Sequence, residues 1–125
     1  MSGFRRWYVV LGAACSLSVM LATAGCRSPH VDITVENRTG SAIQLLEVDY
    51  PSASFGADSL ASGADFHYRI QIRGTGPLKV AYTAAGVPQS TISGPNLSED
   101  QRGRVEVVLL SGGKVEFHPE LTPGQ

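Results

Sequence analysis

From Val31 onward, apolar and polar residues alternate along the chain with a period of two. Val31, Ile33 and Val35 alternate with polar residues, and the same pattern returns over 66–72 and 78–82. This period places one set of side chains on the buried face of a strand and the other set in water. An amphipathic helix needs a period of about 3.6 residues, and no long segment after residue 30 shows it. The alternation therefore predicts an all-β fold built from short strands.

Turn residues between these segments predict three hairpins. The predicted loops are 38–40, 74–76 and 112–113, which set these pairs opposite each other: Val35 with Ile43, Ile72 with Leu78, and Leu110 with Val115. Asn37 and Asn96 begin Asn-x-Ser/Thr sequons, which we interpret as turn chemistry only. The apolar pattern of 105–110 on both faces predicts a central strand.

Three further segments depart from plain alternation. The phase changes between Leu45 and Leu46, which predicts a β-bulge there. Residues 51–63 are rich in Ser, Ala and Gly, so we expect an irregular stretch. Ser98 and Gln101 have the spacing of a capping box, which predicts a single helical turn.

Seven or eight short strands with no long helix predict an antiparallel β-sandwich of about seven strands. This pattern resembles immunoglobulin-like and transthyretin-like sandwiches, although the Cys pair and buried Trp of antibody domains are absent. From the strand pattern we expect one domain over 31–119, followed by a disordered tail over 120–125. We expect these side chains to be buried: Ile33, Ile43, Tyr68, Ile70, Val80, Tyr82, Val107 and Phe117. We expect these to be exposed: Arg69, Gln71, Lys79 and Glu116.

The N-terminal segment has the layout of a secretory signal peptide. Arg5 and Arg6 precede an uncharged apolar stretch over 7–22, and small residues over 23–25 lead to Cys26. A membrane-spanning helix needs about 20 apolar residues, so this stretch is short for one. We therefore interpret residues 1–25 as a cleaved signal peptide, with an uncleaved anchor as the alternative.

The residues before Cys26 resemble the lipobox of bacterial lipoproteins. Ala24, Gly25 and Cys26 match its last three positions, while Thr23 stands where leucine is usual. The resemblance implies that Cys26 is lipidated and that 26–30 form a short tether to a membrane. It also implies a periplasmic face and, from Arg27 after the cysteine, the outer membrane where one is present. The other cysteine, Cys15, lies in the signal, so no disulfide is expected in the mature domain.

Charge and motif content exclude several function classes. Two of the ten basic residues lie in the signal, so 26–125 hold eight basic and eleven acidic residues, a net charge near −3. This balance does not favour nucleic-acid binding. His30, His67 and His118 lie in unrelated positions, so we expect no metal site and no cofactor. No serine lies in a nucleophile motif, so we expect no enzyme activity.

One polar surface is left as a candidate binding site. The predicted hairpin brings together these side chains on one strand face: His67, Arg69, Gln71, Arg73 and Lys79. Such a basic stripe could bind an acidic partner or lipid headgroups, or it could be the solvated face of an edge hairpin. We therefore expect a lipid-anchored, non-enzymatic binding, accessory or structural module of the cell envelope, whose protein partner the residues do not identify. The alternative is a soluble periplasmic or secreted ligand-binding domain.

Overall fold

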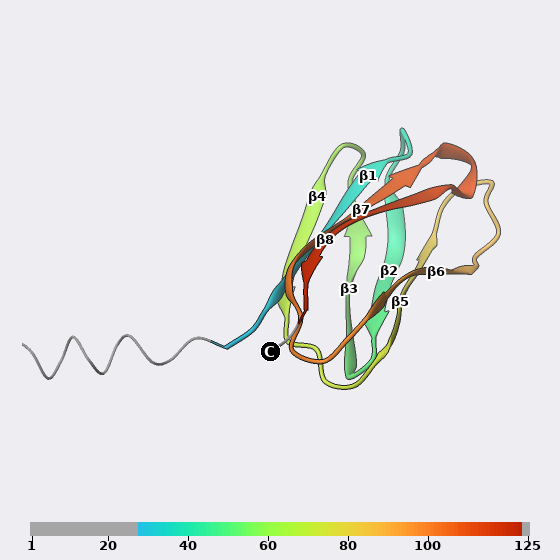
Figure 1. Cartoon of the computed structure of the whole chain (residues 1–125). Helices are drawn as coiled ribbons and strands as arrows, with labels where there is room; N and C mark the ends of the chain where they lie inside the picture. The colour runs from blue at the N-terminus through green and yellow to red at the C-terminus, as the bar shows by residue number, and fades with distance from the viewer. Residues whose placement is uncertain (1–27, 124–125) are drawn as a thin grey trace, which may run out of the picture.

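The structure, a computed structural model, describes residues 28–123 (Figure 1). The expected signal peptide and Cys26 lie outside these residues. The described chain is all-β, with one short 3₁₀ turn at Ser111–Gly113 (η1). Its strands are β1 (Val31–Arg38), β2 (Ile43–Tyr50), β3 (Ala53–Leu60), β4 (Asp65–Ile70), β5 (Gly76–Thr83), β6 (Thr91–Leu97), β7 (Arg102–Leu110) and β8 (Val115–Thr122).

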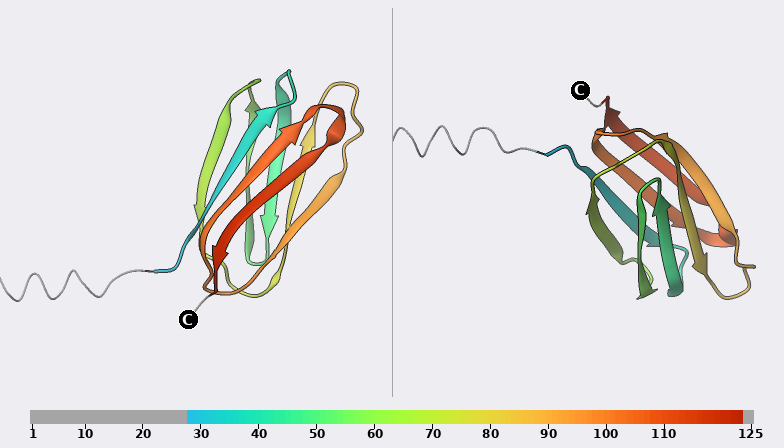
Figure 2. Two further views of the ribbon diagram at one scale, coloured as in Figure 1. Left: turned by 45° about the horizontal axis from the view of Figure 1, so that its top comes forward. Right: turned by 90° about the horizontal axis from the view of Figure 1, so that it is seen from below.

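The strands form two four-stranded sheets that face each other (Figure 2). Sheet A has the order β4-β1-β7-β8, and sheet B has the order β3-β2-β5-β6. Neighbouring strands are antiparallel except β1 and β7, which are parallel. The expected antiparallel arrangement is therefore wrong for this one pair. A parallel pair cannot be joined by a tight hairpin, and here several strands of the other sheet separate β1 from β7 in sequence.

The inner faces of the two sheets meet in one hydrophobic core. Six of the side chains that we expected in the core are confirmed as buried: Ile33, Ile43, Ile70, Val80, Tyr82 and Val107. Tyr68 was expected to be buried but is 46% exposed. It lies on β4 at the edge of sheet A, where no further strand covers it, and its ring stacks on Phe55 with centroids 4.6 Å apart. Phe117, on the edge strand β8, is only partly buried.

Two of the three expected hairpins are wrong. β1 and β2 lie in different sheets, and so do β4 and β5, so the loops at 39–42 and 71–75 cross between sheets. The strands themselves are where the alternation predicts them. Val35 pairs with Phe66 and Val107 rather than with Ile43. An apolar face shows which side of a strand is buried but not which strand lies beside it.

The third hairpin, β7–β8, is confirmed with a shift of one residue. Val115 pairs with Leu109 rather than Leu110, because the loop contains Ser111 as well as the two glycines. The Leu110 amide donates to the Lys114 carbonyl at 2.8 Å and closes the turn. β8 then continues to Thr122, so the ordered domain extends beyond the expected end at residue 119.

The bulge in β2 is confirmed, and two local expectations are wrong. The β2–β5 register shifts by one residue between Gln44 and Glu47, and Leu45 has a φ of 51° and is 60% exposed.

The stretch expected to be irregular contains β3, which pairs along most of its length with β2. Pairing to a well-formed neighbour overrides the low strand propensity of its Ser, Ala and Gly residues. Residues 98–101 form a turn without helix, although the Ser98 amide donates to Gln101 Oε1 at 2.8 Å as in a capping box.

Candidate functional site

His67 and Arg69 of the expected basic stripe lie together on the outer face of β4, beside an acidic residue. Asp32 of β1 is the register partner of Arg69. The Arg69 Nε donates to Asp32 Oδ1 at 3.0 Å, and His67 Nε2 lies 3.6 Å from the same oxygen. These two side chains therefore surround a carboxylate rather than presenting free positive charge.

The other three residues of the stripe lie elsewhere. Gln71 and Arg73 follow β4 in the loop to β5, where the Arg73 amide donates to Ser52 Oγ at 3.3 Å. Lys79 lies on β5 in sheet B, and its register partner on β2 is Asp49. The structure therefore does not gather the five residues on one strand face, because the hairpin that would join them does not form.

The neighbouring Arg69 favours the ionised form of Asp32. The hydrogen bond from Arg69 lowers the pKa of Asp32 and outweighs the opposing effect of burial. A carboxyl group whose pKa is lowered by folding stabilises the protein above its unfolded pKa, and that contribution is lost as the pH falls through the folded value.

Asp32→Asn is therefore expected to lower stability at neutral pH by less than about 1 kcal/mol, because the pair is solvent-exposed and screened. The difference from the parent should shrink as the pH falls below the ordinary Asp value of 3.8. Urea unfolding at several pH values measures it, and high salt should reduce it. A difference that stays constant at low pH would contradict the assignment.

The rest of the outer face of sheet A carries further ion pairs. Arg104 Nη2 lies 2.9 Å from Glu120 Oε2, and His118 Nε2 lies 3.3 Å from Glu116 Oε2. At the far end of the face, Arg38 lies 3.4 Å from Glu36. In each pair a basic side chain lies beside an acidic one, across β7 and β8 for Arg104 and within one strand for the other two. This mixture favours a solvated face over a surface that carries charges of one sign.

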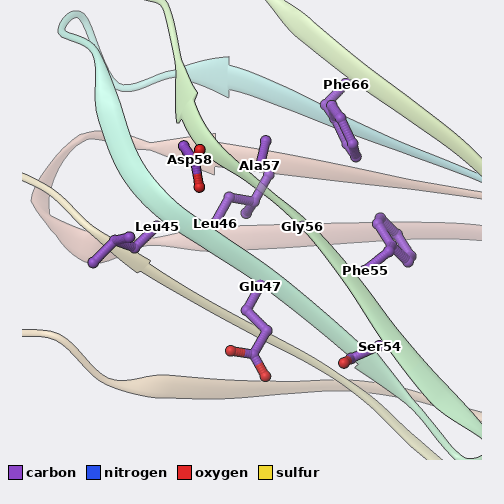
Figure 3. A pocket seen from close by; sticks show the side chains of 9 residues that line it. All are labelled: Leu45, Leu46, Glu47, Ser54, Phe55, Gly56, Ala57, Asp58 and Phe66. Carbon is purple, nitrogen blue, oxygen red and sulfur yellow. The ribbon is translucent and has the colours of Figure 1, made fainter.

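A shallow groove of about 760 Å³ follows β2 and β3 at one edge of the molecule (Figure 3). Leu45 and Phe55 line it, and Phe66 reaches it from β4. Glu47 also lines it, and the hydrogen bond that it shares with Asp49 raises the pKa of Glu47. Sequence reasoning missed this groove, although the phase change at Leu45 marked where an apolar side chain turns outward.

Asn37 connects two loops at one end of the sheets. Its side chain is fully buried, and its Nδ2 donates to the carbonyls of Ser41 at 2.9 Å, Leu60 at 3.0 Å and Ala61 at 3.1 Å. Its Oδ1 accepts from the amide of Thr39 at 3.1 Å and from its hydroxyl at 2.7 Å. The interpretation of this sequon as turn chemistry is confirmed, because a buried amide with these bonds holds the β1–β2 and β3–β4 loops together.

The same end of the molecule holds a small cavity of about 150 Å³. The β1–β2, β5–β6 and β7–β8 connections surround it, and Tyr82 lines it from the end of β5. Both ends of the described chain lie at the opposite end of the sheets (Figures 1 and 2). Val31, at the start of β1, is in register with Gly103, which pairs with Leu121 near the end of β8.

Residues 28–123 contain no cluster of three or more His, Cys, Asp or Glu side chains placed to hold a metal ion. Within the same range, no helix has the length and apolar character to cross a membrane.

The fold and these surfaces define a small all-β domain of two facing four-stranded sheets, with a loop-lined cavity at the end away from its termini. No protein-family model and no curated protein matches the chain. The chain is similar to a protein from Eubacterium rectale whose structure was solved by NMR, with a TM-score of 0.51 and 16% identity. The match covers 81% of this chain and 97% of that one. At this identity the likeness shows the fold alone.

Proposed function

We propose that the protein is a lipid-anchored, non-enzymatic binding or accessory module of the cell envelope, held to the membrane through Cys26. The observation that carries the proposal is the position of Val31, where β1 begins five positions after the cysteine. Five residues span at most about 18 Å when fully extended. Such a tether keeps the end of the domain that carries Val31 close to the membrane surface.

The placement of the loops supports a binding role for the opposite end. Strands of eight residues extend about 26 Å at roughly 3.3 Å per residue. The cavity lined by Tyr82 lies at the end of the strands away from Val31, so the anchor leaves it free to meet molecules of the envelope. Connecting loops on a rigid sheet scaffold are common positions for binding residues.

For the finer fold class we favour the transthyretin-like alternative. In immunoglobulin constant-type domains the first two strands are neighbours in one sheet. Here the first strand lies between the fourth and the seventh, and the second lies in the other sheet. Two sheets of four strands each also depart from the seven-strand immunoglobulin arrangement.

Cys26→Ser is the experiment that tests the anchor. Stable anchoring takes more than one acyl chain, which lipidation of one N-terminal cysteine supplies. The variant, expressed as the full chain in a bacterium, is expected to lose fatty-acid labelling and to remain as the unprocessed precursor. The parent should be labelled and should sediment with the outer membrane in a cell that has one.

The matched control is Cys15→Ser, which changes the other cysteine and should alter neither labelling nor processing. If the Cys26→Ser protein is processed and fractionates as the parent does, the anchor is not at Cys26. If both proteins are then found in the soluble fraction, the soluble periplasmic or secreted alternative holds.

A further inference from the structure

Tyr82, which lines the cavity at the loop end, has a buried hydroxyl that the described part of the protein leaves unpaired. Tyr82 is only 5% exposed, and its side chain extends into the core from β5. Within residues 28–123, its hydroxyl is a buried side-chain group without a hydrogen-bond partner. Because a buried hydroxyl is costly to leave unpaired, natural proteins nearly always satisfy such groups through the chain, a water molecule or a ligand.

A loosely bonded segment of the chain lines the same cavity. Ala84, Ala85 and Val87 line the cavity from the β5–β6 connection. That connection is closed by one isolated bridge between Ala84 and Val87, whose backbone hydrogen bond is long at 3.3 Å. A shift of this turn would let a molecule in the cavity reach the Tyr82 hydroxyl.

The lining of the cavity indicates the chemistry of what it can hold. All ten lining residues are uncharged, so the cavity offers no oppositely charged side chain to an ionic group. Ala84, Ala85, Val87 and Leu110 provide apolar wall, while Thr39, Ser41 and Ser111 provide hydroxyl groups. A cavity of about 150 Å³ can accommodate a benzene-sized molecule.

We propose that this cavity binds a small neutral amide group, whose carbonyl accepts a hydrogen bond from the Tyr82 hydroxyl. The methyl group of an acetamide would pack against the alanine and valine wall, and its N–H would donate to a hydroxyl of the rim. The inference deepens the proposed binding role and does not depend on the anchor at Cys26.

The test is an NMR titration of the full-length, isotope-labelled protein in detergent micelles, with N-methylacetamide as the probe. We expect saturable shift changes at the backbone amides of 84–87 and 111–113, with a dissociation constant in roughly the millimolar range for so small a molecule. Acetate, which has similar size but carries a charge, should bind at least about tenfold more weakly, since the cavity cannot compensate its lost hydration.

Tyr82→Phe is the decisive variant because it removes only the hydroxyl. It should weaken N-methylacetamide binding by about tenfold or more, equivalent to about 1.4 kcal/mol. Without the probe its denaturation midpoint should equal or exceed that of the parent, since an unpaired polar atom has been removed. The matched control is Tyr50→Phe, at the other end of the domain, which should leave probe binding unchanged.

Three results would overturn the proposal: no saturable shifts at these loops, equal binding by Tyr82→Phe, or equal binding of acetate. A lower midpoint for Tyr82→Phe would also count against it, because it would show that the hydroxyl already has a partner. The two experiments are independent. A negative titration says nothing about fatty-acid labelling at Cys26, and a negative labelling result says nothing about binding in the cavity.

Discussion

Asn37→Ala is expected to lower the free energy of unfolding by about 3–5 kcal/mol. The substitution deletes the amide that joins two loops, and it leaves the carbonyls of Ser41, Leu60 and Ala61 without this donor. Leu60 is itself buried, so water cannot fully replace the lost bond. Each buried group left unpaired costs about 1–3 kcal/mol. This is a large share of the total free energy of unfolding of a small domain, which is about 5–15 kcal/mol. Denaturant unfolding of the full chain in detergent measures the change.

Two matched variants separate the role of the Asn37 amide from that of its surroundings. Asn96→Ala changes the asparagine of the other sequon, which is exposed on β6, and should cost less than about 0.5 kcal/mol. Thr39→Val removes only the hydroxyl that donates a hydrogen bond to Asn37 Oδ1, and it should cost about 1 kcal/mol. A loss below 1 kcal/mol for Asn37→Ala itself would show that the loops do not depend on it.

Gly103→Ala is expected to be similarly destabilising, by about 3–5 kcal/mol, for a different reason. Gly103 has a φ of 128°, a region that residues with a Cβ atom rarely adopt. A Cβ atom at this position would also collide with the backbone carbonyl of Glu120 on β8. Because β7 lies between β1 and β8, relief of the collision must disturb the pairing of a central strand.

Gly40→Ala is the control that isolates backbone strain from the collision. Gly40 has a φ of 90°, but a Cβ atom there would meet nothing within 4 Å. It should therefore cost only the strain, about 1–2 kcal/mol. Thermal or denaturant unfolding of both variants tests the difference, and equal losses at the two positions would contradict a steric cause at Gly103.

The strand positions were predictable because alternation is a local property. The segments around Ile33, Ile70 and Val80 each bury one face, and a strand with one apolar face buries that face whichever strand lies beside it. The bulge at Leu45 was predictable for the same reason, since one extra residue exchanges the faces within the strand itself. The central position of β7 followed from apolar residues on both of its faces.

The candidate sites were predictable only in part. Asn37 was identified as a turn residue from its sequon, but its buried bonds to Leu60 and Ala61 join segments more than twenty residues apart. Tyr82 was expected in the core, while its unpaired hydroxyl and the cavity beside it depend on three separate connections. The prediction of a basic stripe was wrong because it placed Lys79 beside β4 through a hairpin that the chain does not form.

The sequence by itself determined that most of residues 31–119 would fold into short strands with one apolar face, and it carries the signal-like segment and Cys26 on which the proposed anchor rests. Only the tertiary structure decided the partners: β1 beside β4 and β7, and β2 beside β3 and β5. A short turn such as 39–42 can either return a strand within its sheet or carry it to the opposite one. Which occurs depends on the burial of all eight strands around one core, a property of the whole molecule that no local pattern contains.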